Sequence, residues 1–297
     1  MGREFFAAMT ARVSRRARFA RVLIGGIALG SLFYGLLIVL TQPTNQRDWS
    51  LDQVRLARTE FFEDKLQIRN IRNVTYRSTS DFDVKWETRS YDLSQVQTVW
   101  FLVEPFSDWR GPAHTFLSFG FANGEFLGIS VEIRKEKGEA FSPFFGLFRQ
   151  YELIYVLADE RDLITLRAKH RNDALYLYKM RATPEKARAL LLSMLQRANA
   201  LALKPEFYNT LTNTCTSNIV EHIDVIAPGR VPFSYKTLLP AYSDDLSFDL
   251  NLIDTTLPRE HYRAAHQINA RVHKFAESPN FSEAIRSPST SVRDAAK

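Results

Sequence analysis

The only cysteine of the chain, Cys215, lies in the run NTCTSNIVEH, where the pattern predicts the start of a helix. Thr214 or Asn213 suits the N-cap position, and apolar residues such as Ile219 and Ile223 follow at helical spacing. The free N–H groups and the dipole of a first helical turn favour a thiolate and can bind an oxyanion. Cys215 is therefore a candidate nucleophile. A lone cysteine is also commonly an inert core residue, and its position in the sequence does not separate the two readings.

A thiol nucleophile needs a base, and the chain has six histidines. His222 follows Cys215 by seven residues, which places it about 10 Å away along a helix, beyond hydrogen-bonding reach. His114 opens an apolar strand, HTFLSFGF, directly after a Gly-Pro pair. The other four histidines lie in charged or polar segments. We therefore expect His114 to be the base.

The hairpin that follows His114 suggests a third catalytic residue. A three-residue loop, 122–124, with glycine in the left-handed conformation makes Leu117 face Ile129, so that the apolar faces of the two strands agree. In this register His114 lies opposite Glu132, with Cβ atoms about 5 Å apart. A carboxylate there can orient the imidazole. The alternative for Glu132 is a surface ion pair with the basic residues that follow it.

Other polar and aromatic residues are weaker candidates. Tyr208 and Asn213 precede the cysteine closely and can donate to an oxyanion, although Tyr208 is equally suited to a core. Glu160 and Arg161 lie in a charged run that is typical of a solvated turn. The alternative is that the two residues support the site or bind the head group of a substrate. The run 144–148, FFGLF, can line an acyl groove, touch a membrane or form a buried loop.

The sequence gives no support for a metal or another cofactor. It has no C-x-x-C motif and no histidine pair at the spacing of metal ligands. Nucleic acid is excluded as a partner by the charge distribution. Residues 1–21 hold six arginines and one acid, so this tail carries nearly all of the net charge of +6, and the rest of the chain is close to neutral.

Residues 22–40 run for 19 positions without a charge, which matches the hydrocarbon thickness of about 30 Å. A cleaved signal peptide is the rival interpretation. The apolar run exceeds the usual length of about 7–15 residues, however, and no A-x-A site follows it. Because the arginines precede the span, residues 1–21 are expected in the cytoplasm and the rest in the periplasm. We expect a single-pass anchor in a bacterial inner membrane.

The remaining pattern predicts one α+β domain over 42–274, followed by a disordered tail over 275–297 rich in serine and proline. A helix is expected to start at Ser50, and another, capped by Thr183, to run over 184–203. The runs with strand character share β-branched and aromatic residues; they are 73–77, 83–87, 97–103, the hairpin around 123–124, 152–157, 163–168 and 175–180.

Four runs resemble the Lnb N-terminal periplasmic domain family, formerly a domain of unknown function: HTFLSFGF, GISVEIRKEKGEAFSPFFGLFRQYELIYVLADERDLITLR, PEFYNTLTNTCTSNIVEH and LLPAYSDDLSFDLNLI. The resemblance covers roughly residues 90–285. It implies a permuted papain-like thiol fold, related to lecithin retinol acyltransferase, with helices packed on an antiparallel sheet and the histidine strand before the cysteine helix. The activity it implies is N-acylation of bacterial lipoproteins, with Cys215 as nucleophile and His114 as base.

Three functions follow as expectations. The first is an acyltransferase that works through a Cys215 thioester on lipid or lipoprotein substrates. The second is a thiol amidase or peptidase of the cell envelope. The third is a non-catalytic periplasmic binding module in which Cys215 is buried. The sequence shows one membrane span, whereas the family name implies members in which further membrane segments follow this domain. The resemblance therefore leaves the identity of the substrate open.

Overall fold

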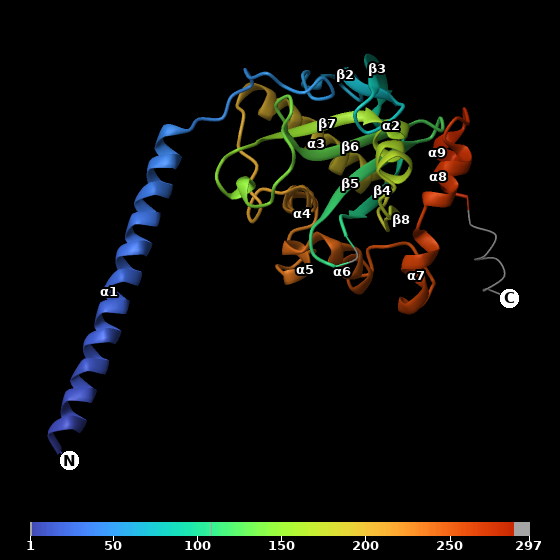
Figure 1. Cartoon of the computed structure of the whole chain (residues 1–297). Helices are drawn as coiled ribbons and strands as arrows, with labels where there is room; N and C mark the ends of the chain where they lie inside the picture. Colours follow the sequence, from blue (N-terminus) through green and yellow to red (C-terminus); the bar gives the residue numbers. More distant parts are fainter. Residues whose placement is uncertain (1, 108, 288–297) are drawn as a thin grey trace. The chain divides into compact units, whose positions relative to one another are not determined.

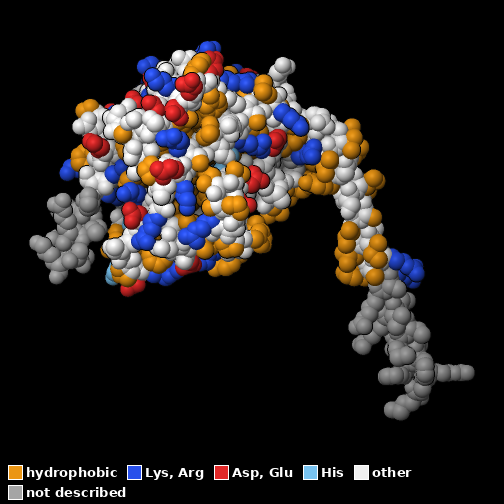
Figure 2. Space-filling model, turned by 180° about the vertical axis from the view of Figure 1, so that it is seen from behind, with side chains coloured by type: hydrophobic (Ala, Val, Ile, Leu, Met, Phe, Trp, Pro, Cys, Tyr) orange, Lys and Arg blue, Asp and Glu red, His pale blue; other side chains and the backbone are white. Residues whose placement is uncertain are grey.

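The computed structural model describes residues 2–107 and 109–287, with side chains from residue 18 onward, and the chain divides into two compact units, 1–43 and 44–297. The first unit is a single helix, α1 (Gly2–Leu40), so the expected tail and span are continuous. Its stretch Arg18–Leu40 has the length and composition of a membrane span, criteria that a signal sequence also meets. Its described surface is almost wholly hydrophobic, with basic side chains toward the N-terminal end (Figure 2).

The second unit is built on an eight-stranded sheet in the order β1-β2-β7-β6-β5-β4-β8, with β3 paired to β2. All pairings are antiparallel except β2–β7, which is parallel. The strands are β1 (Arg58–Phe62), β2 (Lys65–Tyr76), β3 (Phe82–Asp92), β4 (Val96–Pro105), β5 (Ala113–Phe121), β6 (Phe126–Arg134), β7 (Glu152–Asp159) and β8 (Tyr176–Lys179). The α+β class expected from the sequence is confirmed.

The described helices of this unit are α2 (Glu160–Thr165), α3 (Pro184–Leu203), α4 (Cys215–Ile226), α5 (Tyr235–Leu238), α6 (Ser243–Asp249), α7 (Arg259–His266), α8 (Asn269–Phe275) and α9 (Phe281–Ala284). Short 3₁₀ turns are η1 (Leu93–Gln95), η2 (Phe145–Leu147) and η4 (Pro240–Tyr242), and η3 (Leu166–Arg171) is a π-helix that continues α2. Figure 1 shows α8 and α9 beside α2, while α4 lies away from them.

The helices divide between two apolar layers because side chains of a strand alternate between the faces of the sheet. On β5, Leu117 and Phe119 belong to the core that includes residues of α3 and α4. Phe116 belongs to a second core, with residues of α2, α8 and α9. Odd-numbered residues of β5 therefore face α3 and α4, and even-numbered residues face α2, α8 and α9.

The hairpin register expected from the sequence is confirmed. Leu117 pairs with Ile129 and Phe119 with Leu127. The loop closes on Gly124, which has a φ of +84° that an L side chain rarely adopts. Thr183 caps α3 and Thr214 caps α4, also as expected.

The helix expected from Ser50 is wrong, because residues 50–57 form turns and bends that lead into β1. Gln53 explains the difference. Its side chain is buried and its amide donates to the carbonyl of Ile133 at 3.1 Å and accepts from the N–H of Lys135 at 2.6 Å. These tertiary contacts at the end of β6 outweigh the helical pattern.

The strand expected over 163–168 is also wrong. The apolar run lies within α2 and η3, whose first turn is capped by the Asp159 side chain accepting from the N–H of Arg161. A continuous apolar run suits a buried helix as well as a buried strand.

The expectation that residues 275–297 are disordered is wrong for the first part of this segment. Residues 281–284 form α9, and Phe281 and Ile285 are buried. The guanidinium of Arg286 lies 3.7 Å from the centre of the Phe126 ring. The rest of the expected tail, 288–297, lies outside the described residues.

Candidate functional site

Cys215 is the first residue of α4, and its side chain is 6% exposed. It is a free cysteine that shares the core of Tyr208 and Ile219. Its sulfur lies 3.8 Å from the hydroxyl oxygen of Thr216, which in turn lies 3.0 Å from the hydroxyl oxygen of Thr115 on β5. The thiol therefore lies between the start of the helix and the α4-facing side of the sheet.

A capping box fixes the first turn of α4. The N–H of Ser217 donates to the Thr214 hydroxyl at 3.1 Å, and the N–H of Thr214 donates to the Ser217 hydroxyl at 2.8 Å. Helix geometry leaves the N–H groups of Cys215 and Thr216 without an intrahelical acceptor. These two donors, at the positive end of the helix dipole, are suited to an anion beside the sulfur.

His114 and Glu132 lie together, as the hairpin register predicts. Their side chains are bridged by Ser130, whose hydroxyl lies 2.7 Å from Nε2 of His114 and donates to Glu132 at 2.7 Å. The direct distance between His114 Nε2 and Glu132 Oε1 is 4.0 Å. The carboxylate thus reaches the imidazole through a serine hydroxyl.

Burial, together with the guanidinium of Arg167, favours the neutral form of His114. Burial, reinforced by the Arg167 guanidinium, lowers the pKa of His114 to about 3, against the opposing effect of Glu132. Burial acts to raise the pKa of Glu132, but the guanidinium charges of Arg167 and Arg72 outweigh it and hold the pKa below its usual range. The imidazole is an uncharged member of a buried network around Arg167.

The structure does not bring His114 and Cys215 together. The ring of His114 stacks on Phe116 at a centroid distance of 5.7 Å, and the Phe116 ring lies 4.8 Å from the guanidinium of Arg167 on η3. Thr115, the next residue of the strand, instead meets α4. His114 and Cys215 therefore lie on opposite faces of the sheet, and the expectation that His114 is the base for this thiol is wrong.

Glu160 and Arg161 also lie away from Cys215. Glu160 accepts a hydrogen bond from the Ser118 hydroxyl at 2.5 Å and pairs with Arg286 at 2.8 Å. Arg161 donates to the backbone carbonyl of Ser278 at 2.5 Å. Both residues fasten the C-terminal segment to the face opposite α4, so their expected role in the site is wrong.

Tyr208 and Asn213 lie in the segment that leads into α4. The Tyr208 phenol is buried, and burial raises its pKa; the charge of Cys215 acts in the same direction, and a side-chain hydrogen bond with Thr210 opposes it. The Asn213 amide donates to the carbonyl of Phe207 at 2.9 Å and accepts from Asn218 at 2.8 Å. Asn213 therefore shapes the loop, whereas Tyr208 remains a protonated phenol in the core around the thiol.

The aromatic run 144–148 lies beside the same segment. Thr210, in the segment that leads into α4, is hydrogen-bonded to this loop. Its N–H donates to the carbonyl of Gly146 at 3.4 Å, and its hydroxyl donates to the carbonyl of Pro143 at 2.7 Å. Phe144 and Phe145 are 62% and 54% exposed. The loop thus presents aromatic surface next to the chain that precedes Cys215.

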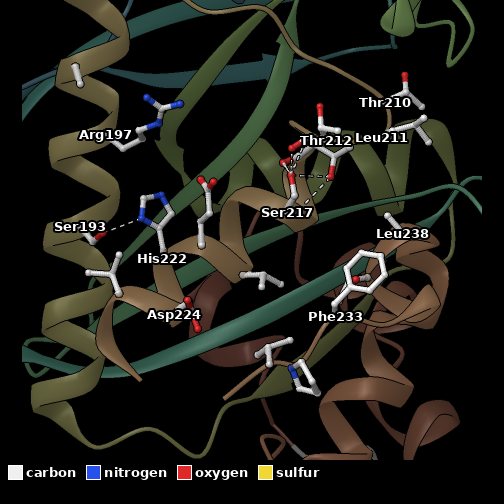
Figure 3. Close-up of a pocket in the computed structure, with 18 of the residues that line it drawn as sticks. Ser193, Arg197, Thr210, Leu211, Thr212, Ser217, His222, Asp224, Phe233 and Leu238 are labelled. Carbon is white, nitrogen blue, oxygen red and sulfur yellow. Dashed lines mark hydrogen bonds between the residues drawn. The ribbon is translucent and has the colours of Figure 1, made fainter. Parts of the chain in front are cut away.

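Sequence reasoning missed a group of polar residues behind α4. Asn218 and His222 follow Cys215 by three and seven positions, on the same buried face, and both meet the hydroxyl of Tyr155 on β7. His222 also meets Ser193 of α3, and both residues line a cavity of about 970 Å³ (Figure 3). The spacing of these polar residues, three and seven positions after Cys215, is the sequence signal that could have placed them on the buried face of α4.

Among residues 18–107 and 109–287, whose side chains the structure describes, no group of three or more His, Cys, Asp or Glu side chains is arranged to hold a metal ion.

The comparisons with known proteins give one family. Residues 82–241, more than half of the chain, match the family described as the Lnb N-terminal periplasmic domain. The comparison with curated proteins found no match, and neither did the comparison with solved structures. The chain therefore belongs to the Lnb N-terminal periplasmic domain family and, with its apolar N-terminal helix, is a membrane-associated periplasmic protein.

Proposed function

We propose that this protein is an acyltransferase, held in the bacterial inner membrane by an uncleaved α1, that forms a thioester on Cys215. The observation that carries the proposal is the position of Cys215 at the first residue of a capped helix. The N–H groups of Cys215 and Thr216 are suited to stabilise a thiolate and then the oxyanion of an attacked ester. The helix terminus thus supplies the electrostatic stabilisation that His114, on the opposite face, does not.

The chemistry divides into two steps. The thiolate of Cys215 attacks the carbonyl of an ester, the carbon–sulfur bond forms, and the carbon–oxygen bond of the ester breaks. The leaving alkoxide takes a proton, for which we assign the phenol of Tyr208, because this side chain belongs to the same buried cluster as Cys215. An amine then attacks the thioester and releases the thiolate, and the excess proton of the amine returns to the phenolate.

A lipid or lipoprotein substrate fits the surface around the thiol. The exposed Phe144 and Phe145 lie on a loop that Thr210 joins to the segment before Cys215. Aromatic side chains of this kind favour an acyl chain over a polar peptide. The family resemblance points the same way, to lipoproteins as acceptors.

The test uses the full-length protein in phospholipid vesicles with a synthetic lipopeptide that carries a free N-terminal amine. We expect acyl transfer to the amine by the wild type, none by Cys215→Ala, and nearly full activity in His114→Gln. Transfer to water in place of the amine would identify the thiol amidase or hydrolase class. Undiminished transfer by Cys215→Ala would overturn the proposal.

The burial of Cys215 supports one other candidate, a non-catalytic binding module. This candidate predicts that iodoacetamide cannot reach the thiol in the folded protein. Alkylation of the native chain at a rate similar to that of the urea-unfolded chain would exclude it.

A further inference from the structure

A second polar group of reactive residues lies at the cavity between α3, α4 and the segment 231–238. Ser193 extends from α3 and His222 from α4, and their side chains point toward one another across the wall of the cavity (Figure 3). The serine oxygen lies 2.8 Å from Nδ1 of His222. The lining combines polar and charged residues, among them Glu221 and Asp224, with an apolar set that includes Leu211, Val220, Val225, Phe233 and Leu238.

The hydrogen bonds behind His222 determine which ring nitrogen carries the proton. The Asn218 amide donates to Asn213 and to the carbonyl of Thr214, both at 2.8 Å, so its oxygen is the atom that accepts from the Tyr155 hydroxyl at 2.9 Å. The single proton of Tyr155 is then used. Its oxygen, 2.8 Å from Nε2 of His222, must therefore accept a hydrogen bond from the N–H at that nitrogen.

It follows that Nδ1 of the neutral imidazole is unprotonated and that Ser193 donates its hydroxyl proton to it. A serine that donates to a bare imidazole nitrogen, with the other nitrogen held by a third group, is the nucleophile–base–orienter arrangement. Arg197, one helical turn after Ser193, also lines the cavity and is held by Glu206 through bonds of 2.8 and 2.6 Å. Its positive charge is suited to stabilise an oxyanion.

We propose that Ser193 is a second nucleophile, with His222 as its base, and that the cavity takes an ester with an apolar acyl group. The Ser193 oxygen attacks the ester carbonyl and its proton moves to Nδ1 of His222. The carbon–oxygen bond of the ester breaks, and the leaving alcohol takes the proton from Nδ1. Water then hydrolyses the acyl-serine and releases the acid. Cys215 takes no part in these steps.

The experiment treats the full-length protein in detergent with an alkyl fluorophosphonate and locates the adduct by peptide mass spectrometry. Attack by Ser193 forms an oxygen–phosphorus bond and expels fluoride, while the proton passes through His222. We expect the adduct on Ser193 of the wild type and of Cys215→Ala, and a labelling rate at least tenfold lower in His222→Gln. The exposed Ser80 is the internal control and should stay unlabelled.

The measurement on the wild type does not depend on how any variant folds. Absence of an adduct on Ser193 would overturn the proposal, as would an equal labelling rate in a His222→Gln variant with a wild-type melting temperature. Because Cys215→Ala removes the proposed thioester but keeps this adduct, failure of one site is distinguishable from failure of the other.

Discussion

The buried His222 should make the stability of the protein depend on pH in a way that a single substitution can isolate. Burial, reinforced by the charge of Arg197, lowers the pKa of His222 from 6.5 to about 4. Between these values the unfolded chain binds a proton that the folded chain does not. The stabilisation is therefore complete above pH 6.5 and is lost as the pH falls toward 4.

The magnitude follows from the size of the shift. One pKa unit corresponds to about 1.4 kcal/mol, so the shift of His222 removes about 3 kcal/mol of unfolding free energy by pH 4. That is a large fraction of the usual stability of a domain, about 5–15 kcal/mol. Carboxylates titrate in the same interval, so the informative quantity is the difference between the wild type and His222→Gln.

The assay is urea unfolding of the full-length protein in detergent, followed by tryptophan fluorescence at pH values from 4.5 to 6. The unfolding free energy of the wild type should fall more steeply with decreasing pH than that of His222→Gln, by about 1.4 kcal/mol per pH unit, which is one proton. The control is Gln196→Ala, which lines the same cavity and should keep the wild-type slope. Equal slopes for the wild type and His222→Gln would refute the assignment of His222 as a buried neutral base.

Three further substitutions test the fold, each by urea unfolding of the full-length chain. Gly124→Ala should lose about 1 kcal/mol, because the positive φ strains an alanine although nothing lies within 4 Å of the added Cβ; no loss would contradict the tight hairpin loop. Phe281→Ala should lose about 3–5 kcal/mol and the exposed Phe144→Ala less than about 1, while similar losses would show that α9 is not packed. Arg167→Met should lose about 3–5 kcal/mol because it leaves Glu132, whose pKa Arg167 lowers against the effect of burial, short of a cation; an unchanged stability would show that this ion pair does not stabilise the fold.

Local signals in the sequence predicted several elements correctly. The threonine caps of α3 and α4 and the glycine of the β5–β6 loop each act through contacts a few residues apart. The apolar run 163–168 and the turns at 50–57 were misassigned because their conformations depend on distant contacts, such as those of the buried Gln53 with the end of β6.

The separation of His114 from Cys215 was partly readable from the sequence. The register that places His114 opposite Glu132 also places it on the face opposite Leu117 and Phe119, and these apolar side chains form the natural contact for the apolar stripe of α4. What the sequence does not reveal is that a second layer of helices buries the polar face as well. That layer depends on Arg167 and its ion pairs, which bring together residues far apart in the chain.

The assignment of Cys215 as the residue that carries the acyl group can be tested by measuring the mass of the intact protein after incubation with phospholipid vesicles in the absence of an acceptor amine. We expect a gain of one acyl chain that maps to Cys215, is released by hydroxylamine, persists in His114→Gln and is absent from Cys215→Ala. A wild-type protein that gains no hydroxylamine-sensitive mass, or a hydroxylamine-sensitive acyl group that remains in Cys215→Ala, would contradict the assignment of Cys215.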